Sequence, residues 1–480
     1  MNDPFQQSLK QFSKNPSLIF SPRAISYFQL SDYARSTAKQ LKKMGVQKGT
    51  RVAIVAPNSA EYVIVLWALW KMGAVACLLS VRTPIAAIED SLKSISCSML
   101  LCADAEIFKS KKVSARKFRL DGMINNDVRH FASGTEESLD LEQEATIVWT
   151  SGSAGEPKAV VHTLGNHYYS ALGANEHIPL AVGDRWLLSL PLYHVAGLAV
   201  LFRALLGGAA VVVPSAADDL FSTIKKQGIT HVSLVPTQLF RMLEQSKEQS
   251  FPKLKAVLVG GSSIAFSLIE KAVAAGIPLH TTYGLTEMAS QVATTGVITQ
   301  KSFENFSAKI LAYREIKIEK DGEILVRGKT LCKGYLEGSK INLPLNPGGW
   351  FATGDLGKMV KKDFIKVTGR KDNMFISGGE NIHPEEIEGL LCRLAPIRDA
   401  VVIPVRHEEF GQRPVAIVKA GSSLTIEEIR TFLEGKIPRF KIPESFYLWP
   451  EEVEGNGLKT NRQEISGLFL SNPKLFKKFL

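Results

Sequence analysis

A glycine-rich stretch at residues 150–158, TSGSAGEPK, constrains this chain more than any other feature. It directly follows the apolar run 147–149, which predicts a buried strand. A glycine-rich turn at the end of a strand can present backbone N–H groups and hydroxyls to an anion. The stretch differs from the P-loop pattern G-x-x-x-x-G-K-[ST], because Gly152 and Gly155 are too close together and no hydroxyl residue follows Lys158. It therefore predicts a phosphate-binding loop of another kind, rather than a flexible surface loop.

Bulk composition is that of an ordinary globular protein with an excess of positive charge. The 480 residues exceed a typical single core, so we expect two or more domains. Hydrophobic residues make up 45% of the chain and charged residues 22%. The net charge of +11 favours nucleic acid, an anionic membrane surface or phosphorylated small molecules, and charge alone does not choose. No nucleic-acid motif stands out, so we expect no nucleic-acid partner.

Cysteine usage and hydropathy indicate a cytoplasmic protein. The five cysteines are sparse and odd in number, and none forms a C-x-x-C pair, which favours a reducing compartment. The N-terminus has no apolar leader segment. The most hydrophobic early run, 62–70, ends at Lys71, well short of the roughly 20 residues that a membrane helix needs. We expect no stable membrane insertion, and the sequence is compatible with a homo-oligomer.

The first hundred residues predict alternating helices and strands. An amphipathic run at 31–44 predicts a helix, 51–56 a strand, and the apolar run 60–72 a second helix with Asn58 as its cap. Such alternation predicts an α/β fold, in which helices cover the faces of a parallel sheet. Residues 104–145 are less regular and predict a variable connection to the phosphate loop.

Two motifs in the middle of the chain predict a nucleotide site. The strand expected within 255–264 ends in Gly260 and Gly261, where a backbone can approach a base or ribose. The second motif, TTYGLTEMAS at 281–290, predicts a tight glycine turn that separates Tyr283 from the Thr-Glu pair at 286–287. The tyrosine could stack on a purine, and the pair offers oxygens to phosphate and Mg²⁺. A single carboxylate is enough for Mg²⁺, because that ion keeps waters and borrows phosphate oxygens.

The last third of the chain predicts a ribose site and a domain boundary. GWFATGDLG at 349–357 places Asp355 in an expected glycine-flanked turn, where its carboxylate could accept from both ribose hydroxyls. The charged turn at 370–372 and a glycine pair follow. Beyond them we expect a compact α+β unit with βα patterning at 396–435 and a basic loop around Lys459.

Five motifs occur in a fixed order along the chain: the phosphate loop, YGLTE, TGD, GRKD and a C-terminal lysine. Because of this order, the chain resembles the adenylate-forming superfamily of acyl-CoA synthetases, luciferases and adenylation domains. Within it, WLLSLPLYHVAG, HVSLVPTQLFRML, LKAVLVGGSSI, EFGQRPVAI and GNGLKTNRQEI are most similar to the o-succinylbenzoate–CoA ligases of menaquinone biosynthesis. The resemblance implies an N-terminal domain, 1–371, of βα-type sheets flanked by helices. A small mobile α+β domain, 372–480, would follow a hinge at Asp372.

The resemblance also implies an activity. ATP and an acid would form an acyl-AMP and pyrophosphate with the help of Mg²⁺, and coenzyme A would then displace AMP. The implied phosphate contacts are Thr150, Ser151, Gly152, Ser153, Lys158 and, for the α-phosphate, Thr286, with Glu287 as the metal ligand. Gly261, Ser262 and Tyr283, with Gly284 beside it, would form the adenine site, and Asp355 and Arg370 the ribose site. Lys459 would bridge the carboxylate and α-phosphate, and Gly378 and Gly379 would serve the thioester step.

Two residues, Arg203 and His194, are the candidates for the acyl site. Arg203 is the one charge on the apolar helix 197–206, so it either snorkels to solvent or waits for a second substrate carboxylate. His194 could gate the acyl pocket or simply pack. Ala154 replaces the usual hydroxyl of the phosphate loop, and 308–318 replaces a glycine- and proline-rich turn. Other aryl or fatty acids, a non-catalytic nucleotide or CoA sensor, and a polyanion-binding structural protein are the alternatives.

Overall fold

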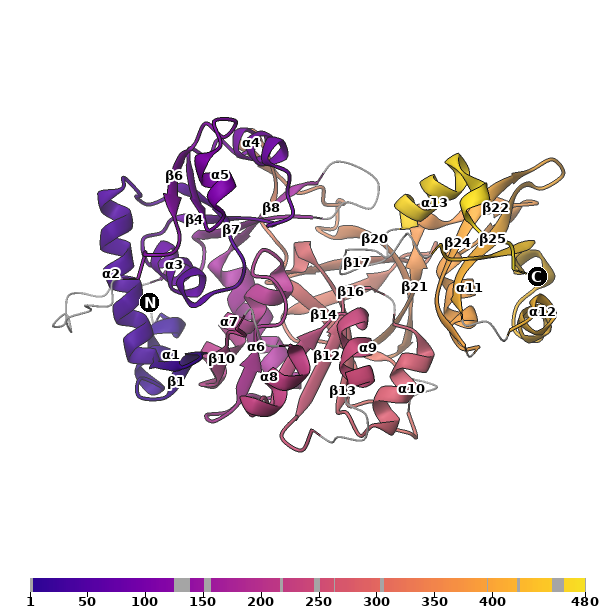
Figure 1. Cartoon of the computed structure of the whole chain (residues 1–480), viewed down its shortest axis with the longest axis horizontal. Coiled ribbons are helices and arrows are strands. Elements are labelled where there is room, and N and C mark those ends of the chain that lie inside the picture. Colours follow the sequence, from indigo (N-terminus) through magenta and orange to yellow (C-terminus); the bar gives the residue numbers. More distant parts are fainter. Residues whose placement is uncertain are drawn as a thin grey trace.

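The computed structural model describes residues 3–124, 139–150, 157–215, 219–245, 251–262, 264–302, 306–394, 396–420, 424–450 and 462–479. The chain forms a large body of sheets and helices, and a smaller body at its C-terminal end lies beside it (Figure 1). This arrangement confirms the α/β fold class with a large N-terminal and a small α+β C-terminal domain. The exact boundary at residues 371 and 372 stays a prediction.

The first sheet of the large body has eight strands in the order β19-β18-β8-β7-β4-β3-β5-β6. They are β3 (Arg51–Val55), β4 (Val75–Leu79), β5 (Met99–Cys102), β6 (Arg116–Arg119), β7 (Glu144–Trp149), β8 (Ala159–Thr163), β18 (Gly334–Glu337) and β19 (Lys340–Asn342). Strands β6, β5, β3, β4 and β7 are parallel, whereas β8 returns antiparallel to β7. β7 therefore ends directly before the predicted phosphate loop.

The second sheet has thirteen strands in the order β16-β17-β20-β21-β15-β14-β13-β12-β11-β9-β10-β1-β2. They are β1 (Pro16–Phe20), β2 (Arg23–Ser26), β9 (Arg185–Leu187), β10 (Ala210–Val212), β11 (His231–Leu234), β12 (Ala256–Gly260), β13 (Leu279–Leu285), β14 (Ser290–Thr294), β15 (Ala308–Ile310), β16 (Arg314–Ile318), β17 (Glu323–Gly328), β20 (Phe351–Lys361) and β21 (Phe364–Arg370). The run from β1 to β13 is parallel, and the strands beyond β13 are antiparallel. The parallel half provides the strand ends where α/β proteins bind ligands.

Within the described ranges the large body has ten helices, and they lie around these sheets (Figure 1). They are α1 (Pro4–Gln11), α2 (Tyr27–Lys43), α3 (Ala60–Lys71), α4 (Ile85–Ser94), α5 (Ala105–Lys109), α6 (Leu164–His177), α7 (Val195–Gly207), α8 (Leu220–Lys226), α9 (Pro236–Gln245) and α10 (Phe266–Ala274). Among the helices of the described ranges, none is long and apolar enough to cross a bilayer.

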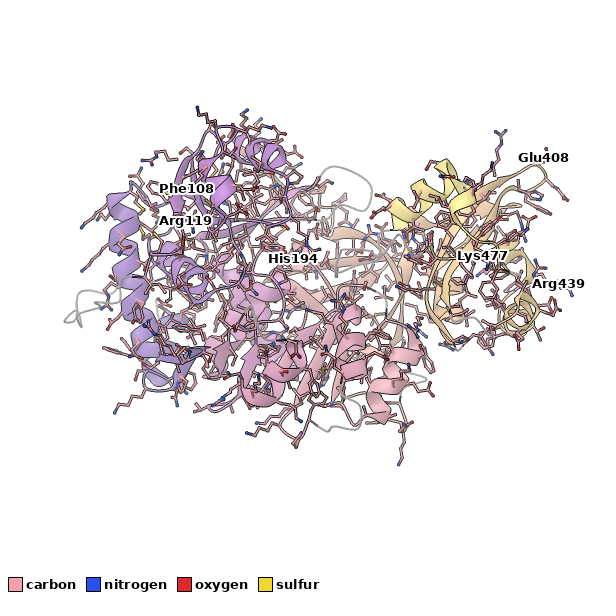
Figure 2. The ribbon with its side chains drawn as sticks, in the orientation of Figure 1. Phe108, Arg119, His194, Glu408, Arg439 and Lys477 are labelled. Atoms are coloured by element: carbon pink, nitrogen blue, oxygen red, sulfur yellow. The ribbon has the colours of Figure 1, made fainter. Side chains whose placement is uncertain are left out.

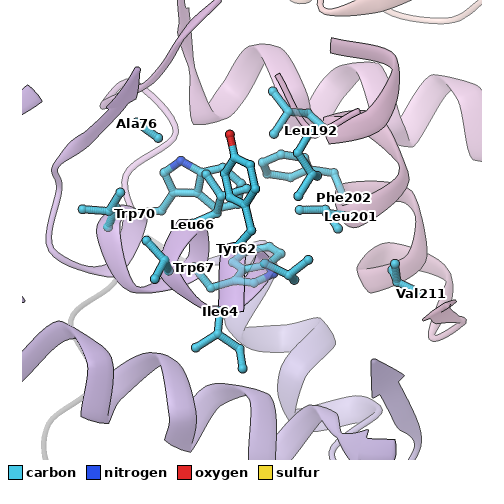
Figure 3. Packing of buried hydrophobic residues seen from close by; sticks show 14 of the residues in the cluster. Tyr62, Ile64, Leu66, Trp67, Trp70, Ala76, Leu192, Leu201, Phe202 and Val211 are labelled. Carbon is cyan, nitrogen blue, oxygen red and sulfur yellow. The ribbon is translucent and has the colours of Figure 1, made fainter. Parts of the chain in front are cut away.

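The core of the large body lies between α3 and α7. α3 is buried almost all round, as expected for a helix that is apolar on every face. Trp67 and Trp70 meet edge to face with ring centroids 5.0 Å apart, and Phe202 of α7 lies 5.0 Å from Trp70 (Figure 3). This packing holds α7, and with it the candidate acyl site, against α3, which in turn contacts β4 of the first sheet.

The smaller body consists of strands β22 (Phe375–Ser377), β23 (Glu380–Ile382), β24 (Ile397–His407), β25 (Gly411–Ala420) and β26 (Ser445–Leu448) with helices α11 (Pro384–Leu391), α12 (Ile426–Glu434) and α13 (Arg462–Ser471). The guanidinium of Arg393 lies 5.1 Å from the ring of Phe266 on α10, and that of Arg398 lies 5.7 Å from the ring of Phe240 on α9. Cation–π contacts thus join the two bodies.

Three local predictions are wrong. Ser59, and not Asn58, caps α3, because its hydroxyl accepts from the N–H of Tyr62 at 3.1 Å. Asn58 instead donates to Leu188 O at 3.2 Å and Leu190 O at 2.8 Å. Residues 396–435 form an antiparallel hairpin, β24–β25, followed by α12, so the expected βα pattern is a ββα pattern. Finally, Gly284 and Asp355 lie within strands β13 and β20, where turns were expected. The register shifts at Gly284 in the β13–β14 pair and around Asp355 in the β17–β20 pair.

Candidate active site

The base of the phosphate loop is closed by two hydrogen bonds between its ends. The N–H of Thr150 donates to Lys158 O at 3.0 Å, and the N–H of Lys158 donates to the Thr150 hydroxyl at 3.2 Å. Ser151, Gly152, Ser153 and Ala154 lie outside the described residues. The two ends of the loop, Thr150 and Lys158, are therefore bonded to each other directly after β7.

The Thr-Glu pair lies at the end of β13, in the short 3₁₀ helix Thr286–Met288. Three groups from the first sheet and its β18 segment hold this turn. His162 donates to Thr286 O at 2.7 Å, the N–H of Cys332 donates to Glu287 O at 2.7 Å, and the hydroxyl of Tyr335 donates to Glu287 Oε1 at 2.8 Å. The site is thus built where the two sheets meet.

Burial fixes the protonation state of His162. It is fully buried, and burial lowers its pKa to about 4, so the ring is neutral at pH 7. Since a carbonyl can only accept, we assign the ring proton to Nε2, which faces Thr286 O. Behind it, Thr146 and His167 bond each other at 2.9 Å, and burial also lowers the pKa of His167. A neutral donor therefore holds the turn without adding charge beside the Glu287 carboxylate.

The expected ribose carboxylate is held at both oxygens. Tyr283 donates its hydroxyl to Asp355 Oδ2 at 2.7 Å, and Arg370 donates to Asp355 Oδ1 at 2.8 Å. Arg370 also bonds Asp372, the predicted hinge residue, at 3.1 Å. Burial of Asp355 raises the pKa of its carboxyl group, although both partners oppose that shift. The structure therefore brings four sequence-predicted residues, Tyr283, Asp355, Arg370 and Asp372, into one network.

The expected adenine edge lies at the carboxyl end of β12, beside Tyr283. Gly261 has a left-handed backbone with φ of +86°, and Gly261 and Ser262 are exposed. A Cβ on Gly260 would lie 2.6 Å from the side chain of Thr282, so only glycine lets these neighbouring strands approach. Gly284 is exposed, and a Cβ there would lie 2.1 Å from Ser290 O. The glycines among these positions offer backbone, and not side chains, to a flat ligand.

The two predicted acyl-site residues occupy opposite ends of α7. His194 is exposed at the helix N-terminus, near the middle of the large body in Figure 2. Arg203 is only 3% exposed, which excludes snorkelling to solvent. Its guanidinium lies 5.0 Å from the ring of Trp186, and burial lowers the pKa of Arg203 to about 9, so it is charged at pH 7. Its Nε has no hydrogen-bond partner among the described residues.

The glycine pair of the smaller body forms the tight turn of the hairpin β22–β23. Gly378 and Gly379 have φ of +57° and +86°, as a two-residue hairpin turn with two left-handed residues requires. A Cβ on Gly378 would lie 2.9 Å from the ring of Phe410. The turn borders a cavity of about 250 Å³ lined by Ser377, Gly378, Glu380, Phe410, Arg413, Arg439 and Phe440. Figure 2 shows Arg439 on the side of the smaller body that faces away from the large body.

Three residues of the site, His162, Tyr335 and Arg314, were not predicted from the sequence. Arg314 is buried in the altered 308–318 segment and donates to Gln291 O at 2.6 Å, Ala312 O at 2.7 Å and Ser170 O at 3.0 Å. The one signal for it was an arginine in a segment that replaces a glycine- and proline-rich turn. His162 had no signal beyond its place in a short apolar strand. Lys459, the predicted catalytic lysine, lies outside the described residues.

A magnesium ion fits the donors present at Glu287. Tyr335 engages Oε1 of this carboxylate, and Oε2 is the remaining oxygen for a cation. Among the described residues, no group of three or more His, Cys, Asp and Glu could hold a metal by itself. One carboxylate, water and phosphate oxygens satisfy Mg²⁺. Glu287 would hold the ion, which supplies neutralisation of phosphate charge when bound.

Comparison with known protein families assigns both parts of the chain. The model of the AMP-binding enzyme family matches residues 5–336, and the AMP-binding enzyme C-terminal domain matches residues 386–456. The chain belongs to the AMP-binding enzyme family. This membership confirms the resemblance to the adenylate-forming superfamily.

Curated relatives narrow the likeness within the AMP-binding enzymes. A 2-succinylbenzoate–CoA ligase from Bacillus cereus is 32% identical over 457 residues, which cover 92% of this chain and 94% of that protein. The protein of the same name from Bacillus anthracis is also 32% identical, over 92% of this chain and 93% of that protein.

Solved structures of AMP-binding enzymes match nearly the whole chain. The o-succinylbenzoate CoA synthetase MenE from Bacillus subtilis, in complex with its acyl-adenylate intermediate, aligns with a TM-score of 0.84 at 28% identity and covers 97% of this chain and 98% of that one. The same enzyme in complex with ATP and magnesium ion aligns with a TM-score of 0.82 at 29% identity, over 94% and 96% of the two chains. ATP-bound MatB from Rhodopseudomonas palustris has a TM-score of 0.85 at 21% identity, over 98% and 99%, and shares the fold.

Proposed function

We propose that this protein is an ATP-dependent, AMP-forming 2-succinylbenzoate–CoA ligase that makes o-succinylbenzoyl-CoA for menaquinone biosynthesis. The acid first reacts with ATP to give an acyl-AMP and pyrophosphate, and coenzyme A then displaces AMP. Family membership, the curated relatives and the MenE structures support this activity and its substrates ATP, Mg²⁺ and coenzyme A.

The choice of o-succinylbenzoate as the acid rests on Arg203, which is buried and has an unsatisfied nitrogen atom. A buried guanidinium costs several kcal/mol in desolvation unless an anion or hydrogen bonds compensate. Arg314 is compensated, because its three nitrogen atoms donate to backbone oxygens. Arg203 has a stacked Trp186 ring, and its Nε is unsatisfied among the described residues. A second carboxylate on the substrate would supply the missing acceptor, whereas a simple aryl or fatty acid would not.

The residues of the nucleotide site suit the first step. A carboxylate is a poor acyl donor, and its adenylation needs positioned reactants and neutralised phosphate charge more than covalent help. Thr150 and Lys158 would contact the β- and γ-phosphates, Thr286 the α-phosphate, and Glu287 the metal. Asp355 and Arg370 would hold the ribose beside Tyr283. Lys459 would stabilise the charge at the reacting phosphorus as the acid attacks.

The cavity beside Gly378 suits the second step. Its walls combine two phenylalanine rings with two guanidinium groups, from Arg413 and Arg439. Aromatic rings can stack on adenine, and arginines pair with phosphates, so the nucleotide part of coenzyme A matches this lining. The pantetheine arm would then lead past the glycine turn.

A panel of acids tests the proposal. Pyrophosphate release is measured with ATP, Mg²⁺ and coenzyme A for o-succinylbenzoate, benzoate, coumarate and a medium-chain fatty acid. We expect a strong preference for o-succinylbenzoate. Preference for another acid would retain the ligase and overturn its substrate, and nucleotide binding without turnover of any acid would favour a non-catalytic sensor.

The proposed function also predicts where the protein is located, whereas its assembly is a separate prediction. An enzyme acting on ATP and coenzyme A fits the cytoplasm, and fractionation of cells that express the chain tests this. Assembly into a homo-oligomer stays a prediction that light scattering of the purified protein decides.

A further inference from the structure

Tyr335 touches two residues of the nucleotide site at once. Its hydroxyl donates to Glu287 Oε1 at 2.8 Å, and its ring lies under the ammonium of Lys158, with Nζ 4.9 Å from the ring centroid. The side chain is only 8% exposed. The phenol is the donor in this bond, because a carboxylate can only accept.

The backbone leaves Tyr335 little freedom. β18 pairs antiparallel with β8, with Tyr335 opposite Val160, so its ring reaches Lys158 just before that strand. Gly334 has φ of +143°, and a Cβ there would lie 2.7 Å from the carbonyl of Asn342. Only glycine allows β18 to lie this close to β19. The tyrosine is therefore held by strands on both sides.

Both partners of Tyr335 belong to the proposed ATP site but to different elements. Glu287 follows β13 in the thirteen-stranded sheet, and Lys158 precedes β8 in the eight-stranded sheet. A carboxylate that receives a hydrogen bond at one oxygen presents the other in a fixed direction, and such outer partners tune metal affinity. An aromatic ring beneath an ammonium group likewise restricts the position of that group through a cation–π interaction.

We propose that Tyr335 is a positioning residue that aligns the metal carboxylate Glu287 with the phosphate-contacting Lys158 for formation of the acyl-AMP. This inference rests on the proposed nucleotide chemistry, but not on which acid is the substrate. The hydroxyl acts on the metal through Glu287, and the ring acts on the phosphates through Lys158. Removal of the hydroxyl should therefore weaken metal binding, and removal of the ring should weaken nucleotide binding.

Tyr335→Phe removes the hydroxyl and keeps the ring. We expect binding of Mn²⁺ in the presence of α,β-methylene-ATP, followed by electron paramagnetic resonance, to weaken by about tenfold. The Mg²⁺ concentration for half-maximal pyrophosphate exchange should rise by about the same factor, while the KM for the acid changes less than twofold. A merely structural role would lower the Tm and leave the metal titration unchanged.

Tyr335→Leu removes the ring as well. We expect it to raise the Kd for the ATP analogue about fivefold beyond the value for the Phe variant, because Lys158 loses its platform. Equal nucleotide affinity in the Phe and Leu variants would overturn the role assigned to the ring.

A matched control is available in Tyr313, whose hydroxyl bonds Glu176 Oε1 at 3.3 Å outside this site. Tyr313→Phe should leave the Mn²⁺ titration unchanged, and an equal shift there would overturn the proposal. In a Glu287→Gln background, Tyr335→Phe should have no further effect on Mn²⁺ binding, and an additive effect would show that Tyr335 does not act through Glu287. Wild-type protein that binds no Mn²⁺ with the nucleotide would instead refute the proposed function itself.

Discussion

Arg203 and Arg314 show how two buried arginines in one domain can differ. Arg314 gives its N–H groups to backbone oxygens of α6, β14 and its own turn, and so ties these elements together. Arg203 stacks on Trp186 and retains an unsatisfied Nε. The same residue type therefore serves as a structural tie at one position and as a candidate anion receptor at the other.

Replacing Arg203 tests that distinction. For Arg203→Leu we expect a KM for o-succinylbenzoate raised by about tenfold or more, because a charge-assisted bond contributes about 1.5–3 kcal/mol. The KM for ATP should change little. Steady-state pyrophosphate release over a range of acid concentrations measures both, and an unaltered KM for the acid would remove Arg203 from the substrate site.

Replacing Lys459 separates the two steps. We expect Lys459→Ala to lose acyl-AMP formation severely, because its charge would stabilise the reacting phosphorus, and to lose much less in thioester formation from preformed acyl-AMP. Rapid-quench measurement of each half-reaction makes the comparison. Equal damage to both would refute the assignment of the lysine to the first step.

At the scale of elements, strands hold two site residues that the sequence had placed in turns. The glycines of YGLTE and TGD predicted turns, yet Gly284 and Asp355 lie in β13 and β20. Glycine marks a close approach of two chains as readily as a turn, and sequence alone does not separate these cases. The Tyr283–Asp355 bond, between residues 72 positions apart, depends on strand order and could not be predicted from spacing.

The hairpin β22–β23 and its neighbouring cavity give a prediction for the second step. We expect Arg439→Ser to raise the KM for coenzyme A by about tenfold through loss of a phosphate contact, while pyrophosphate release without coenzyme A stays unchanged. Arg430→Ser is the matched control, because Arg430 is an exposed arginine on α12 that bonds Glu444 O at 2.9 Å. Equal KM values for the two variants would place coenzyme A elsewhere.

At the scale of the molecule, the sequence predicted the two-part α/β architecture and the order of motifs well, because hydrophobic periodicity and glycine loops are local signals. It could not predict that β8 and β18 carry His162 and Tyr335 to a turn of the other sheet. Those contacts join residues 124 and 48 positions apart, and only the packing of two sheets creates them.

Buried histidines make the whole fold sensitive to acid. Burial lowers the pKa of His162 and of His231 to about 4, and lowers those of His167 and His280 as well. Between pH 6.5 and 4 the unfolded chain binds protons that the folded chain does not, so stability falls as the pH falls. Each residue shifted to about 4 contributes at most about 3 kcal/mol.

Urea unfolding at pH 7.5, 6 and 5 measures this effect. We expect the free energy of unfolding to decrease steadily over this series. His231→Gln, which cannot titrate, should show a smaller decrease than the wild type. A pH-independent free energy of unfolding would show that these histidines are not neutral in the folded protein.

The bonds from His162, Cys332 and Tyr335 to the 286–287 turn cross from one sheet to the other. These bonds fix the position of the 286–287 turn relative to the first sheet, and the two sheets also share buried hydrophobic residues. On warming, a small shift between the two sheets would misalign Glu287, the proposed metal ligand, while every strand remained intact. Activity should consequently be lost at a temperature several degrees below that at which the far-ultraviolet circular dichroism changes. A saturating nucleotide, which would contact residues of both sheets, should bring the two temperatures together.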